Sequence, residues 1–149
     1  MNLFLELLQN KILITAGTAW FVAQVLKFFI HIIVNKQVVW ERLIGDGGMP
    51  SCHTCTVCAS ATAVAIYCGL ASPEFAIMAI LAIIVMHDAT GVRLETGKQA
   101  VVINDMMEFL QSLGNKTSEE RLSEFVGHTP LQVAIGAILG ICYSLLLNL

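Results

Sequence analysis

The stretch Gly47-Gly48-Met49-Pro50-Ser51-Cys52-His53 ends a polar connection and sets where an apolar segment begins. Its two adjacent glycines allow the backbone to approach a ligand closely. Pro50 is typical of the first turn of a helix, where its missing N–H costs nothing. The N–H groups at the start of that helix favour an anion such as phosphate, while Ser51 adds a hydroxyl and His53 exchanges protons near neutral pH. The same residues also fit a polar turn followed by a helix cap, and both interpretations stay open at this point.

The composition around this stretch is that of an integral membrane protein. Of the 149 residues, 56% are hydrophobic and 13% are charged, whereas charged residues make up about a quarter of a soluble domain. The length suits a single membrane domain, residues 1–149. The five cysteines do not predict a disulfide framework. Cys52, Cys55 and Cys58 share a broad helix face, and we interpret them as small packing residues rather than metal ligands. We expect no metal, no cofactor and no nucleic-acid partner.

Four apolar segments predict an all-α bundle with about four membrane-spanning helices. They cover about residues 12–34, 50–70, 75–91 and 130–147, close to the roughly 20 residues that cross a bilayer. Residues 2–10 predict a short interfacial turn of helix. The polar segment 92–127 carries an approximate helical stripe of apolar residues, which predicts an amphipathic helix lying on the membrane or on the bundle. A capping box that starts at Thr117 predicts a further short helix ending at Gly127.

The small and polar residues of these segments indicate how the helices pack. The second segment is rich in Ala, Thr, Ser and Cys, which favours a central position because small side chains let helices approach closely in lipid. Gly136 and Gly140 give the last segment a close-packing face. In the first segment Gln24, Lys27 and His31 share one helix face, and polar groups at that depth usually point into the bundle. For Lys27, snorkelling to the membrane surface is the alternative.

Four spans place both polar connections, residues 35–50 and 92–127, on one side of the membrane. The starts of the second and fourth segments and the end of the third then meet at that face. The residues expected to converge there are Ser51, His53, Asp88, Arg93 and His128, with Lys27 reaching them from the first segment. Most Lys and Arg residues lie on this side as well, which the positive-inside rule assigns to the cytoplasm.

Two of these stretches resemble motifs of the type-2 phosphatidic acid phosphatase superfamily, which also contains the vanadium haloperoxidases. Pro50-Ser51-Cys52-His53 resembles its PSGH motif. Gly127-His128-Thr129-Pro130-Leu131-Gln132-Val133, followed by Gly136 and Gly140, resembles its third motif. Over nearly its full length the chain is similar to the divergent bacterial and plant branch of this superfamily, which consists of small membrane proteins.

The resemblance implies phosphoryl transfer through a histidine. It makes His128 the nucleophile that forms a phosphohistidine and His53 the acid that protonates the leaving oxygen. The residues that it implies for phosphate binding are Ser51, Arg93, Lys27 and, as a weaker candidate, Arg42. The implied substrate is a lipid or isoprenoid phosphate monoester or pyrophosphate, and the implied location is the bacterial cell membrane.

Several positions depart from the superfamily pattern. Cys52 stands where the PSGH motif has Gly, and no Pro follows Arg42. Gln132 occupies the position of the Asp that orients the nucleophilic histidine. Glutamine accepts a hydrogen bond but offers no negative charge to an imidazolium, and Asp88 is the candidate to replace that carboxylate. A non-catalytic protein that binds anionic headgroups, or a membrane scaffold, is therefore the alternative function, and a homo-oligomer stays open in either case.

Overall fold

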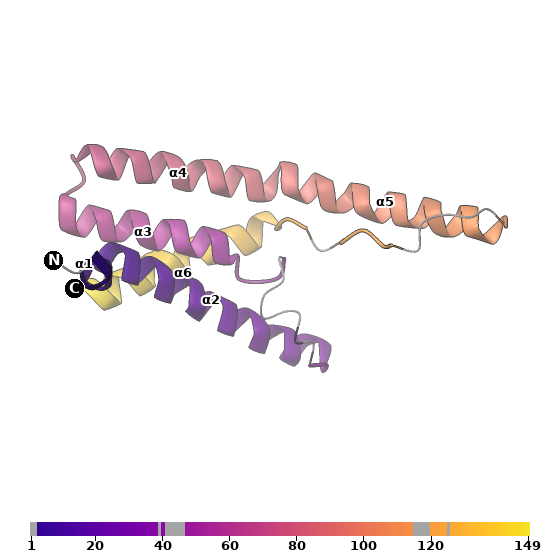
Figure 1. Cartoon of the computed structure of the whole chain (residues 1–149), viewed down its shortest axis with the longest axis horizontal. Helices are drawn as coiled ribbons and strands as arrows, with labels where there is room; N and C mark the ends of the chain where they lie inside the picture. The colour runs from indigo at the N-terminus through magenta and orange to yellow at the C-terminus, as the bar shows by residue number, and fades with distance from the viewer. Residues whose placement is uncertain (1–2, 39, 41–46, 115–119, 125) are drawn as a thin grey trace.

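Helices are the only regular secondary structure in the described part of the chain (Figure 1). The structure, a computed structural model, describes residues 3–38, 40, 47–114, 120–124 and 126–149. Its helices are α1 (Leu3–Gln9), α2 (Lys11–Asn35), α3 (Cys52–Cys68), α4 (Pro73–Thr90), α5 (Val92–Ser112) and α6 (Pro130–Asn148). Among the described residues, α2, α6 and the rod Pro73–Ser112 are long and apolar enough to cross a membrane. The expected all-α membrane bundle is thereby confirmed.

Helix α3 lies at the centre of the bundle and packs against α2, α4 and α6. It has 17 residues, which makes it about 25 Å long, somewhat shorter than a hydrocarbon core of about 30 Å. Helix α1, the end of α6 and the turn between α3 and α4 gather at one end of the bundle (Figure 1). The starts of α3 and α6 lie toward the other end, as the expected topology requires.

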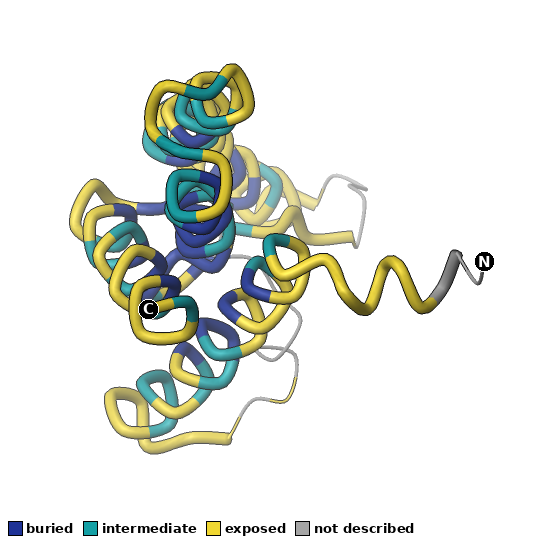
Figure 2. Tube along the Cα trace, turned by 90° about the vertical axis from the view of Figure 1, so that its left-hand side faces the viewer, coloured by how far each residue is buried: buried dark blue, intermediate teal, exposed yellow. Residues whose placement is uncertain are grey.

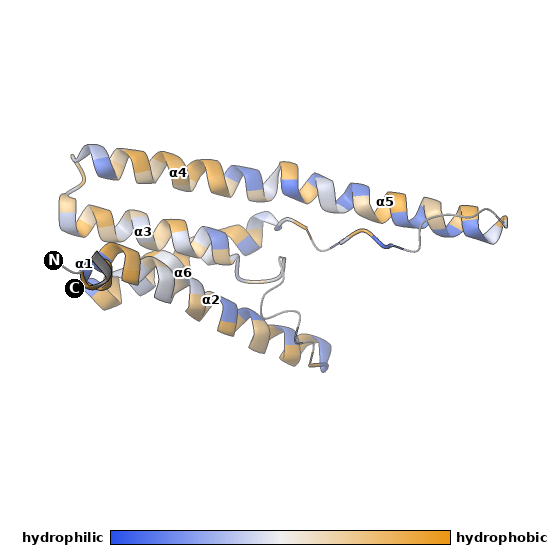
Figure 3. Cartoon of the chain, in the orientation of Figure 1, coloured by the Kyte–Doolittle hydropathy of each residue, from blue (hydrophilic) through white to orange (hydrophobic). Residues whose placement is uncertain are grey.

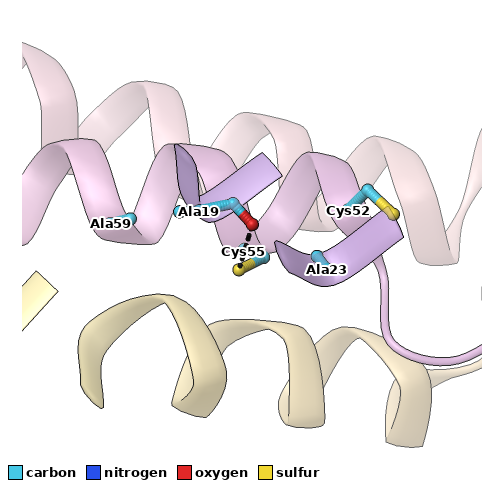
Figure 4. Packing of buried hydrophobic residues seen from close by; sticks show 5 residues of the cluster. All are labelled: Ala19, Ala23, Cys52, Cys55 and Ala59. Atoms are coloured by element: carbon cyan, nitrogen blue, oxygen red, sulfur yellow. Dashed lines mark hydrogen bonds between the residues drawn. The ribbon is translucent and has the colours of Figure 1, made fainter. Parts of the chain in front are cut away.

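The interior is built from small side chains rather than from large apolar ones. Its central cluster consists of Ala19, Ala23, Cys52, Cys55 and Ala59 (Figure 4). The Cys55 thiol donates to the Ala19 carbonyl at 3.6 Å, which joins α3 to α2. Viewed along the bundle, buried residues face the middle and exposed ones the outside (Figure 2). Large apolar side chains lie outward, which is the expected arrangement when lipid, not water, surrounds the helices.

Two glycines bring the backbones of α3 and α6 together. A Cβ placed on Gly136 would lie 2.6 Å from the Ser51 carbonyl oxygen, and one on Gly140 would overlap the Cys55 carbonyl oxygen. Real Cβ atoms do not approach oxygen so closely, so any larger residue would push the two helices apart. The predicted close-packing face of the last segment is confirmed.

The start of α3 differs from the sequence prediction for Pro50. Helix α3 begins at Cys52, with Ser51 as its N-cap, so Pro50 precedes the helix instead of occupying its first turn. The reason is that the Ser51 hydroxyl oxygen accepts from the Thr54 N–H at 3.4 Å, which satisfies a backbone donor that the first turn leaves unpaired. Pro73 and Pro130 do begin their helices, after the caps Ser72 and Thr129.

The polar segment after α4 does not lie on the bundle. Helix α5 continues the line of α4 past the other helices (Figure 1) and contacts only α4 among them. It alternates polar and apolar residues, whereas α4 is almost uniformly apolar (Figure 3). The short helix predicted to end at Gly127 is wrong for its described part, because residues 120–124 and 126–127 are not helical. Thr117, the first residue of its predicted capping box, lies outside the described residues, and Glu120, the second, is not helical.

Residues 120–124 and 126–127 instead run back along α5 toward α6 (Figure 1), and Asn104 holds Leu122 there. Its side-chain amide donates to the Leu122 carbonyl at 2.9 Å, and its Oδ1 accepts from the Leu122 N–H at 3.0 Å. The same amide donates to the Glu124 carboxylate at 2.8 Å. Because Asn104 is buried, these bonds replace the internal hydrogen bonds that a short helix would have made.

We expect Gly140→Ala to destabilise the protein by about 1–3 kcal/mol, because the added methyl group overpacks the α3–α6 contact. Gly17→Ala is the matched control: Gly17 lies inside α2 with open space around its missing Cβ, so its replacement is expected to stabilise by about 0.5–1 kcal/mol. Reversible unfolding of both variants in detergent micelles measures the difference. Equal stability of the two variants would contradict the close contact.

We expect Asn104→Ala to accelerate hydrogen exchange of the Leu122 amide by about tenfold or more, since loss of a buried partner costs about 1–3 kcal/mol. Asp105→Ala, one position away on the exposed side of α5, should leave that exchange unchanged. Exchange of the amides inside α3 should be the same in both variants. Unaltered Leu122 exchange in Asn104→Ala would show that other contacts hold the returning segment.

Candidate functional site

A polar pocket lies where the starts of α3 and α6 meet α2. Its volume is about 140 Å³. The residues that line it are Trp20, Gln24, Lys27, Gly47, Cys52, His53 and His128. The first three come from α2, Cys52 and His53 from the first turn of α3, and His128 from the segment just before α6. Three residues selected from the sequence, Lys27, His53 and His128, therefore line one pocket.

Lys27 points into the bundle rather than toward the membrane surface. Only 4% of its surface is exposed, and Gln24, one turn earlier, is 7% exposed. The side-chain Oε1 of Gln24 accepts from the Cys52 thiol at 3.0 Å, which ties α2 to the first turn of α3. The aliphatic stem of Lys27 passes beside Gly48, where a Cβ would lie 3.4 Å from two of its carbons. Gly48 has a φ of +88°, a conformation that glycine adopts without strain.

The hydrogen bonds around His128 define which ring nitrogen carries the proton. Gln132 Oε1 accepts from the Thr129 backbone N–H at 3.1 Å, so this side-chain atom is an oxygen and an acceptor. His128 Nδ1 lies 3.3 Å from the same oxygen. Nδ1 therefore donates its proton, and in the neutral ring Nε2 keeps its lone pair. The main chain of this residue is fixed as well, because its N–H donates to the Ala89 carbonyl at 3.0 Å.

The surroundings of His128 favour its neutral form. Burial is the main cause that lowers its pKa from the ordinary value of 6.5, and the neighbouring His53 and Lys27 act in the same direction. The hydrogen bonds to Gln132 and to the backbone of Gly48 oppose this shift without cancelling it. A neutral imidazole with a lone pair on Nε2 is the form in which histidine acts as a nucleophile or a base.

Ser51 is not among the residues that line the pocket. It is fully buried, and its hydroxyl oxygen accepts from the N–H and the hydroxyl of Thr54, at 3.4 and 3.1 Å. Its own N–H donates to the Gln132 carbonyl at 3.2 Å, which fastens the start of α3 to the start of α6. In this arrangement Ser51 holds the starts of α3 and α6, and with them His53 and Gln132, in place.

Asp88 and Arg93 are not among the residues that line the pocket. They pair with each other at 2.7 Å near the junction of α4 and α5, and both side chains are more than 40% exposed. Gln132, not Asp88, contacts His128 Nδ1, so the expectation that Asp88 replaces the orienting carboxylate is wrong in this structure. The physical reason is that Arg93 already engages this carboxylate. Arg42 lies outside the described residues.

Two contributors to the site were not assigned a role from the sequence. Trp20 lines the pocket from α2, and its spacing from Gln24 and Lys27, four and seven residues, is the helical signal that identifies it. Asn104 holds the segment that leads to His128. Asn104 lies on the same face of α5 as Gly97 and Ala100, and all three are buried. A polar residue on such a face of small residues is the sequence signal that could have identified it.

Comparison with known proteins gives the family. The Divergent PAP2 family matches residues 8–143. The Uncharacterized membrane protein YuiD of Bacillus subtilis (strain 168) is 40% identical over 153 residues, covering 96% of this chain and 97% of that protein. No solved structure is significantly similar to the chain. With its full-length relative described as a membrane protein and its bundle built from membrane-length helices, this chain is a membrane protein that belongs to the Divergent PAP2 family.

Proposed function

We propose that this protein is a membrane phosphatase that hydrolyses a lipid or isoprenoid phosphate monoester or pyrophosphate through a phosphohistidine on His128. The observation that carries the proposal is that His53 and His128, from two different elements, line one pocket together with the buried Lys27. A nucleophile, a proton donor and a cation around one small space are the groups that phosphoryl transfer to an amino acid side chain requires.

In the proposed first step, His128 Nε2 attacks phosphorus. A P–N bond forms while the P–O bond to the alcohol, or to the leaving phosphate of a pyrophosphate, breaks. His53 gives its proton to the departing oxygen, and the Lys27 ammonium stabilises the negative charge on the phosphoryl oxygens. In the second step water attacks phosphorus and gives a proton to His53. The P–N bond breaks, so that inorganic phosphate leaves and both histidines return to their starting forms.

The pocket volume supports a phosphate group as the ligand. About 140 Å³ is well below the 300–1,000 Å³ of sites that enclose a drug-sized ligand. The pocket therefore fits the phosphoryl group, whereas the rest of an amphiphilic ester must lie outside it. Its place at the end of a membrane bundle suits a substrate whose tail remains in lipid.

We further propose that the protein resides in the bacterial cell membrane with this pocket on the cytoplasmic side. Lys36 and Lys98 belong to the connections at the pocket end of the bundle, and an excess of positive charge marks cytoplasmic loops. A substrate made in the cytoplasm would then reach the site without crossing the membrane.

A second function has one observation in its favour, namely the neutral Gln132 beside His128. A carboxylate would stabilise the positively charged ring that arises when Nε2 of His128 is phosphorylated, and glutamine does not. A protein that binds the phosphate of a headgroup without turning it over would retain the pocket and have no need for this carboxylate.

Phosphate release from a panel of lipid phosphates tests the proposal. We expect His128→Ala to abolish release, and Gln132→Glu to increase kcat by about tenfold, because Glu keeps the reach of Gln and adds the stabilising charge. His87→Ala, which alters an exposed histidine outside the pocket, is the control and should retain full activity. Release that survives in His128→Ala excludes the phosphohistidine. No release from any substrate by the parent or by Gln132→Glu favours the headgroup-binding protein.

The pH dependence of kcat/KM gives an independent check. Because the pKa of His128 is lowered from 6.5, the nucleophile stays neutral into mildly acidic solution, and activity should fall only below that pH. In Gln132→Glu the carboxylate favours the imidazolium, so the acid limb should move to higher pH. An acid limb that lies above pH 6.5, or that is the same in both proteins, would contradict the assigned surroundings of His128.

A further inference from the structure

A second, larger cavity adjoins the polar pocket. Its volume is about 310 Å³, against about 140 Å³ for the pocket. The residues that line it are Lys27, Ile30, His31, Val34, Asn35, Gly47, Gly48, Met49 and Gln132. It therefore lies along the second half of α2, facing the loop before α3 and the first turn of α6.

The two spaces meet at the groups assigned to phosphate chemistry. Lys27 and Gly47 line both of them. His128 lines the pocket, and Gln132, which contacts the ring of His128, lines the larger cavity. A phosphate ester whose phosphoryl group occupies the pocket can thus extend past Lys27 into the cavity.

The walls of the cavity combine an apolar surface with two hydrogen-bonded polar residues, His31 and Asn35. Ile30, Val34 and Met49 supply apolar surface. The Asn35 side-chain NH₂ donates to the His31 carbonyl at 3.1 Å and lies 2.9 Å from His31 Nδ1. Since the partner of a carbonyl must be the nitrogen of the amide, that NH₂ also donates to Nδ1, and the imidazole proton resides on Nε2. His31, which lines this cavity, thus has one N–H donor, at Nε2.

We propose that this cavity holds the alcohol portion of the phosphate ester and that His31 Nε2–H donates to an oxygen of that alcohol. The proposal rests on the proposed function in one respect, that the phosphoryl group binds in the pocket. What it adds is a specificity residue: a ligand with a hydroxyl or ester oxygen close to its phosphate, as in a glycerol phosphate with an acyl chain, gains a hydrogen bond to His31. A plain alkyl or isoprenoid phosphate has no such oxygen and gains nothing from His31.

Equilibrium binding to the full-length protein in detergent micelles tests this assignment, with three phosphorus ligands that resist hydrolysis or need none. The first is the phosphonate analogue of a singly acylated glycerol phosphate. The second is an alkyl phosphonate of the same length without the glycerol oxygens. The third is inorganic phosphate, which occupies the pocket alone. Phosphate release from the corresponding natural esters is measured in parallel.

Two variants measure separately how the space in the cavity and the His31 donor contribute to binding. Ile30→Trp fills the cavity and should weaken both long ligands by about tenfold or more, while inorganic phosphate binding changes less than twofold. Ile33→Trp is the matched control on α2, since Ile33 is 75% exposed and does not line the cavity. His31→Phe keeps a ring but removes the donor, and should weaken only the glycerol ligand, by about fivefold, the worth of one hydrogen bond.

The outcomes distinguish the inference from the proposed function. Discrimination in binding without any phosphate release supports the cavity assignment and overturns the phosphatase. Phosphate release with equal effects of His31→Phe on the glycerol and alkyl ligands overturns the assignment and retains the phosphatase. Equal weakening by Ile30→Trp and Ile33→Trp also overturns the assignment. Binding of none of the three ligands to the parent protein overturns both.

Discussion

The close approach of the α3 and α6 backbones is the constraint on which the rest of the structure depends. Gly136 and Gly140 leave no room for side chains against Ser51 and Cys55. In lipid, burial of apolar surface gives little drive for helix association, so this contact depends on small residues and backbone proximity. Because the Ser51 N–H also bonds to the Gln132 carbonyl, the packing places the starts of two helices side by side, and with them His53 and His128.

A second set of backbone contacts fixes the segment that carries His128. Gly127, at a φ of +85°, lies directly against the backbone of Arg93 and Leu94, and the His128 N–H bonds to Ala89. Further along α5, Asn104 takes up the backbone polar groups of Leu122. The long α4–α5 rod therefore acts as a support for the returning chain. This support accounts for the position of α5, a polar helix that extends past the bundle and packs against the returning chain instead of the other helices.

The chemistry proposed for the pocket depends on Gln132, a neutral residue that contacts His128 where the superfamily motif has an aspartate. Gln132 fixes the ring of His128 with the proton on Nδ1, as a carboxylate would, since its oxygen is held in place by the Thr129 N–H. It supplies geometry without charge, and burial then keeps the ring neutral. For the proposed phosphoryl transfer, such a site orients the ring of His128 but stabilises its positively charged form less than a carboxylate would. A slow phosphatase and a phosphate-binding protein are both compatible with such a site. The Gln132→Glu variant, which adds a negative charge beside His128, distinguishes between them.

By itself the sequence determined the helical segments, the small-residue packing face and the end of the bundle at which His53, His128 and Lys27 lie, because apolar run length and helical spacing are local properties of the chain. Only the tertiary structure decided the rest. Whether Ser51 caps a helix or faces a ligand, whether Asp88 meets His128 or Arg93, and whether residues 120–124 form a helix depend on which partner is nearest in space. A hydroxyl, a carboxylate or a backbone amide bonds to whatever the packing brings within about 3 Å, and that distance is set by contacts between segments far apart in the chain.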